Sequence, residues 1–359
     1  MPCYHPLKAF PIGFNSSGKR NMKVTSYEVE SVFQLSPGGP WYSSRDKVRP
    51  PNCFAYCCRP VTVPCGHCIG CRLEYSRQWA NRCMMELQYH DSSYFVTLTY
   101  NDEHVPRSYY GNPESGEALP SLSLHKRDFQ LFMKRLRKRF SDDKIRFFMC
   151  GEYGPTTFRP HYHAILFGLH LDDLVPFSRS EQGFQYYTSQ SLQEVWSVRD
   201  PSFGETSVTP LSPLGHVLVA NVSWETCAYT ARYITKKLTG PQASFYSDFN
   251  IEKPFTLMSR KPGIARQYYD DHPDMYEYEY INIKTETGGR KFRPPRYFDR
   301  LFDLDQPEAS AELKATRQRM AEEAKKAKLS QTTLSYLELL QVEENAKLDA
   351  IKSLDRSEI

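Results

Sequence analysis

The order of strand-type and helix-type segments between residues 94 and 238 constrains the fold of this chain most. Residues 94–100 are β-branched and aromatic and predict a buried strand. Residues 126–140 carry apolar side chains at helical spacing and predict an amphipathic helix. The later segments are two strands in KIRFFMCGE and RPHYHAILFGL, a short helix near 192–196, a strand in 215–224 and a helix over 226–238. This order is typical of an α+β fold, most simply an antiparallel sheet with helices on one face.

The segments outside this series have weaker patterns and suggest three divisions. Residues 1–85 are rich in Cys and Pro, and we expect an irregular segment stabilised by a bound metal. Residues 86–305 hold the α+β domain, with loops at 106–121 and in MSRKPGIARQYY and PPRYF. Residues 306–359 are mostly helix formers interrupted near 330–333, which predicts two amphipathic helices or a tail that folds on a partner.

Composition excludes several classes of protein. The sequence has no run of about 18 apolar residues and no signal peptide, so we expect neither a membrane span nor export, and place the chain in the cytoplasm. Ten Cys in a chain of this length indicate reduced thiols and a metal site rather than a disulfide framework. No G-x-x-x-x-G-K-[ST] loop occurs, so an ATPase or helicase module is not expected.

Positive charge is concentrated in the middle of the chain. Residues 126–146 carry nine Lys or Arg and three Asp, although the net charge of the whole chain is only +4. This pattern suggests a nucleic-acid footprint, and a solvated helix face explains it equally well. The side chains expected to contact a nucleic-acid backbone are Lys126, Arg127, Lys134, Arg135, Arg137, Lys138, Arg232 and Lys237.

Two histidines stand at the head of the strand RPHYHAILFG. Because side chains at i and i+2 of a strand share a face, His161 and His163 can converge on one ion. Glu152 ends the preceding strand, and the turn between them would bring it beside the pair. Two imidazoles and one carboxylate suit Mg²⁺ or Mn²⁺ with positions left open, whereas histidines buried in the core are the alternative.

The helix expected over residues 226–238 has two distinct faces. Cys227 and Ala231 lie on a narrow apolar stripe, and Tyr229, Tyr233 and Lys236 lie opposite it. Core packing is the ordinary role of such tyrosines, but here the stripe already faces the core. A phenol has a pKa near 10, so a nucleophilic Tyr needs nearby cations or a metal that activates its target.

A cysteine cluster precedes the α+β domain. PCGHCIGC places Cys65, Cys68 and Cys71 at a spacing typical of zinc or, as the alternative, an iron–sulfur cluster, and free loop cysteines are the third possibility. We expect structural zinc with Cys3 as the fourth ligand. Other possible fourth ligands are Cys53, Cys57, Cys58, His5 and His67.

Together the motifs FVTLTY, RPHYHAILFG and AYTARYITKK resemble those of rolling-circle replication initiators of the HUH endonuclease superfamily. The resemblance is greatest to the initiators of gokushoviruses, a branch of the microviruses that infect bacteria. It extends from Cys3 to about Phe298 and implies an HUH/RRM-like core.

The resemblance implies a mechanism. An ion on Glu152, His161 and His163 would activate a phosphodiester of single-stranded or supercoiled phage origin DNA, and Tyr229 or Tyr233 would attack it. A 5′-phosphotyrosine link and a free 3′-hydroxyl would result, and the second tyrosine would allow rejoining. Lys236 would stabilise the negative charge of the phosphate or the phenolate. Because it follows Tyr233 at the spacing of the motif, Tyr233 is favoured as the first nucleophile. Host helicase and DNA polymerase, in the cytoplasm of a bacterial host, are the implied partners.

Two other functions stay open from the residues alone. One is a zinc-stabilised DNA-binding protein without catalysis, in which the histidines and tyrosines are structural. The other is a metallo-phosphoesterase for small nucleotides, which would need neither paired tyrosines nor a long basic helix.

Overall fold

The computed structural model describes residues 3–352 except 17, 19, 113, 181–182, 200–209, 233–239, 279 and 286–287. It has two compact units. One comprises residues up to 74 together with those from 316 onward, and the other comprises residues 75–315. The boundaries expected for the α+β domain, at residues 86 and 305, stay a prediction. Among the described residues, no helix has the length and hydropathy that a membrane span requires.

The larger unit is built on a seven-stranded sheet in which every neighbouring pair is antiparallel. In spatial order its strands are β12 (Leu174–Arg179), β13 (Gln185–Ser189), β16 (Val217–Asn221), β7 (Ser93–Thr99), β11 (Pro160–Phe167), β10 (Arg146–Tyr153) and β17 (Phe255–Met258). The strands predicted from the sequence are therefore present, and the mixed α+β class is confirmed.

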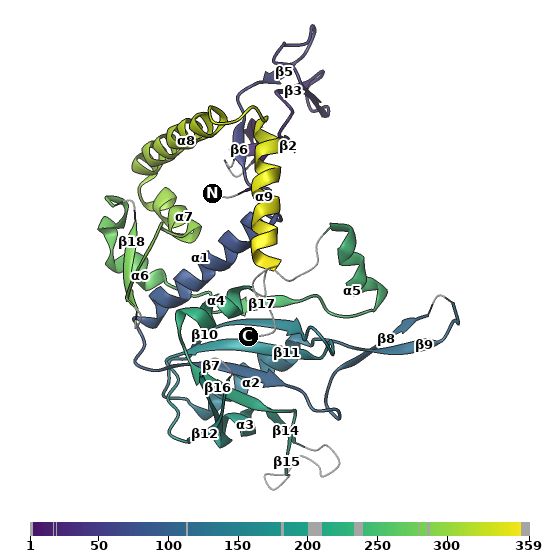
Figure 1. The fold of residues 1–359 in the computed structure, drawn as a ribbon, viewed down its shortest axis with the longest axis vertical. Coiled ribbons are helices and arrows are strands. Elements are labelled where there is room, and N and C mark those ends of the chain that lie inside the picture. The colour runs from purple at the N-terminus through teal and green to yellow at the C-terminus, as the bar shows by residue number, and fades with distance from the viewer. Residues whose placement is uncertain are drawn as a thin grey trace. The chain divides into compact units, whose positions relative to one another are not determined.

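Helices cover both faces of this sheet (Figure 1). They are α1 (Ile69–Leu87), α2 (Lys126–Arg139), α3 (Gln190–Val195) and α4 (Trp224–Arg232). On one face, Phe129 of α2 packs with Tyr162 of β11. On the other, Trp79 of α1 and Cys227 of α4 pack in one cluster with Ile165. The expectation of helices on one face is wrong, because β11 is apolar on both faces and each face must be covered.

The N-terminal segment is more regular than the sequence predicts. Two three-stranded sheets are formed by β1 (Leu7–Phe14), β2 (Arg20–Ser26) and β6 (Val61–Val63), and by β3 (Ser31–Gln34), β4 (Trp41–Ser44) and β5 (Ala55–Cys57). The 19-residue helix α1 follows. The expectation of an irregular segment is wrong, because most of these strands are too short to produce a clear alternation of apolar and polar residues.

The expected tail forms two helices, α8 (Pro307–Leu329) and α9 (Tyr336–Lys352), as predicted. Part of it packs on the N-terminal segment within the smaller unit. The Glu344 carboxylate of α9 lies 2.6 Å from the His5 imidazole, and the Lys325 ammonium of α8 donates to the Tyr27 hydroxyl at 2.8 Å. Leu340 is buried. The tail therefore has a partner within its own chain.

Several segments expected to be loops contain regular structure. Residues 106–121 include most of a hairpin, and the sequences MSRKPGIARQYY and PPRYF include parts of helices. These elements are short, so flanking Pro and Gly hid their patterns. The remaining elements are β8 (Arg107–Gly111), β9 (Ala118–Leu122), β14 (Ser197–Arg199), β15 (Leu211–Pro213), η3 (Gly240–Ala243), α5 (Ser244–Asp248), α6 (Arg266–Asp271), η4 (Pro273–Tyr276), β18 (Ile281–Thr285), β19 (Gly288–Phe292) and α7 (Arg296–Asp305).

A buried carboxylate joins three elements of the larger unit. Glu86, on α1, is only 4% exposed. It accepts hydrogen bonds from the Arg146 guanidinium on β10 and from the Ala265 amide, the latter at 2.5 Å, and the His90 imidazole lies 3.2 Å away. Burial alone would raise the pKa of Glu86, but these partners outweigh it, and the pKa lies below its usual value.

We expect Glu86→Gln to lower the free energy of unfolding by about 3 kcal/mol at pH 7, because Arg146 then loses its buried counter-charge. A carboxylate with a lowered folded-state pKa stabilises the fold above the unfolded pKa of about 4.3. That stabilisation is lost as the pH falls through the folded-state pKa, so the difference between variant and wild type should shrink in acid. Urea titrations of variant and wild type, at pH 7 and at an acidic pH, measure this difference. The exposed Glu103→Gln is the control. Equal stability of variant and wild type at pH 7 would contradict it.

Candidate metal and tyrosine site

The strand register brings the three predicted metal ligands together. Glu152 on β10 pairs directly with His161 on β11, and His163 lies two residues further on the same face. One ligand atom of each residue lies within 4.8 Å of the others. Glu152 and His163 are buried, and His161 is half-buried, so the group is open to solvent on the His161 side.

The hydrogen bonds of the group indicate which nitrogen faces the carboxylate. Nδ1 of His161 lies 3.1 Å from the backbone carbonyl of Arg159, which can only accept, so Nδ1 carries a proton. In the neutral imidazole, Nε2 then presents a lone pair, and it lies 2.7 Å from Glu152 Oε1. Two acceptors at this distance repel each other unless a cation, either a proton or a metal ion, lies with them. The donor set therefore fits a divalent ion.

The electrostatics of Glu152 agree with a cation site. Burial raises the pKa of this carboxyl, but hydrogen bonds and charge from His161 and His163 lower it by more. The net pKa is therefore below its usual value. Nε2 of His163 lies 3.2 Å from Glu152 Oε1. Oε2 of Glu152 is buried, and it has no hydrogen-bond partner among the described residues. A buried carboxylate oxygen of this kind is suited to bind an ion.

Strand β7 supplies two residues that contact His163 and were not predicted as site residues. The Thr97 hydroxyl lies 3.0 Å from His163 Nδ1, and the Phe95 ring stacks on the same imidazole with centroids 5.4 Å apart. If Nδ1 donates to Thr97, the Nε2 lone pair of His163 is directed toward Glu152. The sequence feature that could have identified these two residues is the i, i+2 spacing of Phe95 and Thr97 in FVTLTY, which puts both side chains on one face of the strand.

Helix α4 places a predicted tyrosine beside the histidines. Its N-terminus is capped by Ser223 and Thr226, whose side chains each accept from the other's amide, at 3.2 and 2.9 Å. Cys227 and Ala231 are buried, as the stripe requires. The half-buried Tyr229 ring meets the His163 imidazole edge-on at a centroid distance of 5.1 Å. Tyr233, Lys236 and Lys237 lie outside the described residues.

The basic helix α2 lies on the opposite face of the sheet from this site. Its residues pack with Tyr162, whereas His161 and His163 point to the face covered by α4. Arg135 donates to the Val195 carbonyl at 2.8 Å and is half-buried, so it has a structural contact within the fold. The exposed side chains of this set are Lys126, Arg127, Lys134, Arg137 and Lys138, with Arg232 at the end of the described part of α4. Among the described residues that were predicted to contact a nucleic-acid backbone, Arg232 is therefore the one that lies on α4, the helix beside the histidines.

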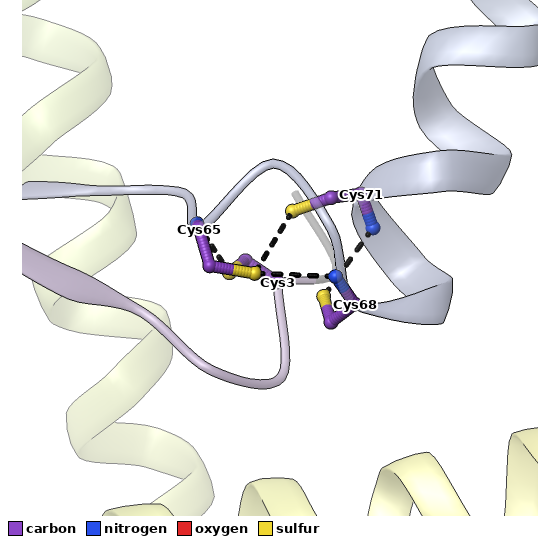
Figure 2. Close-up of side chains that lie close together, drawn as sticks. All are labelled: Cys3, Cys65, Cys68 and Cys71. Atoms are coloured by element: carbon purple, nitrogen blue, oxygen red, sulfur yellow. Dashed lines mark hydrogen bonds between the residues drawn. The ribbon is translucent and has the colours of Figure 1, made fainter. Parts of the chain in front are cut away.

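The predicted cysteine group also comes together. The sulfur atoms of Cys3, Cys65, Cys68 and Cys71 all lie within 4.8 Å of one another (Figure 2). The other proposed ligands are not members of this group; His67 is exposed, and His5 pairs with Glu344. Among the described residues, two groups are thus able to hold a metal, each inside one compact unit.

Comparisons with known proteins find phage replication-associated proteins. A family model described as replication-associated protein ORF2/G2P matches residues 93–238. Replication-associated protein ORF2 of Spiroplasma virus 4 is 30% identical over 302 residues, covering 82% of this chain and 85% of the relative. Replication-associated protein VP4 of Bdellovibrio phage phiMH2K is 28% identical over 316 residues, covering 86% and 79%.

A third relative, replication-associated protein ORF4 of Chlamydia phage 1, is 25% identical over 246 residues, covering 67% of this chain and 53% of the relative. No solved structure matches the chain. The similarity to the Spiroplasma virus protein spans most of both sequences, and the family model covers the residues of β7, β10, β11 and α4. This chain is a member of the family of phage replication-associated proteins.

Proposed function

We propose that this protein starts rolling-circle replication by cutting and rejoining single-stranded phage origin DNA through a tyrosine–phosphate link. One observation carries the proposal: the Tyr229 ring lies against His163, a member of the Glu–His–His group. A nucleophile and a cation site on one face of the sheet are what attack on a phosphodiester requires. Membership in the replication-associated family supports the same reaction.

The roles of the individual side chains follow from their positions. Glu152, His161 and His163 would hold Mg²⁺ or Mn²⁺, which supplies polarisation of a phosphodiester oxygen when bound. The Tyr229 oxygen attacks phosphorus, the bond from phosphorus to the 3′-oxygen breaks, and the 3′-oxygen leaves with a proton as a hydroxyl. The DNA strand stays attached through its 5′-phosphate. A 3′-hydroxyl is the end that a polymerase of the host can extend.

Other residues complete the cycle in this proposal. Tyr233, one helical turn beyond Tyr229 in sequence, would cut the regenerated origin, and the first 3′-end would then displace a tyrosine and close a circle. Arg232 follows Tyr229 by three residues on α4 and is exposed, so it can contact a phosphate. Lys236 and Lys237 would act similarly. Host helicase and polymerase, in the bacterial cytoplasm, would supply strand separation and synthesis.

The first test is a covalent adduct. Incubated with Mn²⁺ and circular single-stranded DNA that carries the phage origin, the wild-type protein should form a protein–DNA product resistant to SDS. The Tyr229→Phe/Tyr233→Phe variant should form none, because it has lost both phenolic oxygens. The exposed Tyr278→Phe is the matched control and should react like the wild type. An adduct that persists in the double variant would refute the proposal.

Single variants identify the first nucleophile. The sequence favours Tyr233 because Lys236 follows it, and Tyr229 is a candidate because its ring contacts His163. The variant that lacks the first nucleophile should lose initial cleavage of a linear origin strand. The other variant should still cleave and should fail to circularise the product. Peptide mass mapping of the linked tyrosine provides an independent reading.

A third prediction concerns Thr97. We expect Thr97→Val to weaken Mn²⁺ binding by about 10–100-fold, because the valine cannot orient His163 through Nδ1. Isothermal titration with Mn²⁺ measures this without DNA. Thr188→Val on β13, which β16 separates from β7 in the same sheet, is the matched control. An unchanged affinity in Thr97→Val would show that Thr97 does not position the histidine.

A further inference from the structure

The cysteine group lies where two chain segments and a helix start meet. β1 pairs antiparallel with β6, with Leu7 opposite Val63, so Cys3 and Cys65 lie at the same end of the strand pair. Cys68 directly precedes α1, and Cys71 is in its first turn. Gly66 has a φ of +85°, a left-handed conformation that turns the chain between Cys65 and Cys68. Residues from three elements thus direct their sulfurs inward (Figure 2).

The distances suit a single ion. The Cys65 and Cys71 sulfurs are 4.0 Å apart, and all four lie within 4.8 Å. A tetrahedral ion with bonds of about 2.3 Å to sulfur holds its ligands about 3.8 Å apart. An iron–sulfur cluster of several irons separates its cysteine sulfurs further, because different cysteines bind different irons. None of the four cysteines forms a disulfide.

Backbone amides surround the sulfurs as they would surround thiolates. The Cys65 amide donates to Cys3 Sγ at 3.3 Å, and the Cys68 amide donates to Cys65 Sγ at 3.3 Å. Cys68 Sγ accepts from the Tyr4 amide at 3.4 Å and from the Cys71 amide at 3.5 Å. Such donors reduce the repulsion among negatively charged sulfurs that bind one cation. Cys68 and Cys71 are buried and Cys65 is half-buried, so little solvent reaches the group.

We propose that Cys3, Cys65, Cys68 and Cys71 bind one Zn²⁺ in a closed, structural site. Four protein ligands leave no position for substrate, so the site takes no part in phosphoryl transfer. Its role is to fasten the start of β1 to the end of β6 and the first turn of α1. Four of the six strands in the N-terminal segment have only three or four residues, and β1 pairs with β6 over three residues, so a bound ion would add to the contacts that join these elements.

Metal analysis of the purified full-length chain tests the site. After dialysis against metal-free buffer, the wild type should retain about one zinc per chain by plasma mass spectrometry. Cys68→Ser and Cys71→Ser should each lose most of it, because a serine oxygen is a poor zinc ligand here. Cys58→Ser, which changes a half-buried cysteine of the same segment outside the group, should retain it. Absence of zinc from the wild type, or iron with sulfide in its place, would overturn the proposal.

A second measurement covers variants that fail to fold. The wild-type chain refolded with Co²⁺ should show the intense visible absorption of a tetrahedral cobalt tetrathiolate, and a spectrum of octahedral cobalt would overturn the proposal. Glu152→Gln provides the separation from the nuclease function: it should keep its zinc while losing the DNA adduct. Loss of zinc in Glu152→Gln with retention in Cys68→Ser would mean that the metal belongs to the histidine site.

Discussion

The antiparallel register of β10 and β11 is the constraint on which the candidate metal and tyrosine site depends. Pairing Glu152 with His161 places a carboxylate beside an imidazole, and the two-residue period of β11 then adds His163 on the same face. A shift of one residue would turn both histidines to the face of α2. The register is held by the apolar continuation of β11, since Ala164, Ile165, Leu166 and Phe167 are all fully buried. The core thus positions the polar ligands.

The same sheet separates two surfaces with different chemistry. One face carries the Glu–His–His group, Thr97 and Tyr229, and the other is covered by the basic helix α2. A single strand of DNA held at the histidines would therefore first meet α4 and Arg232. The positive charge of α2, which is the most prominent charge pattern in the sequence, lies on the other face of the sheet. Arg135 of α2 stabilises the fold through its hydrogen bond to the Val195 carbonyl.

The smaller unit solves a different physical problem. Its strands are short and its sheets have three strands each, so apolar burial alone gives it little stability. Helix α9 packs within it, with the Glu344 carboxylate close to His5, and the zinc proposed for the four cysteines at one end of the β1–β6 pair would add a cross-link. The tail, and the metal proposed for the cysteine group, would thus both stabilise this segment.

Much of the site could be predicted because its members lie within short motifs. Local periodicity determined that His161 and His163 share a face, that Cys227 and Ala231 face the core, and that residues 126–140 form an amphipathic helix. The cysteine spacing indicated a thiolate group, and Cys3, the fourth ligand expected from the sequence, lies with the other three. The N-terminal strands were missed because segments this short show no period, and the hairpin at 107–122 was missed for the same reason.

Tertiary structure decided which motifs meet. The sequence by itself determined most strands and helices between residues 93 and 232, the polar faces of those helices and the residues proposed to bind metal or attack phosphate. It could not determine that α2 and α4 cover opposite faces, that Thr97 and Phe95 support His163, or that the tail packs on the N-terminal segment. The reason is physical: propensity and periodicity act over a few residues, whereas strand register and packing join groups tens or hundreds of residues apart.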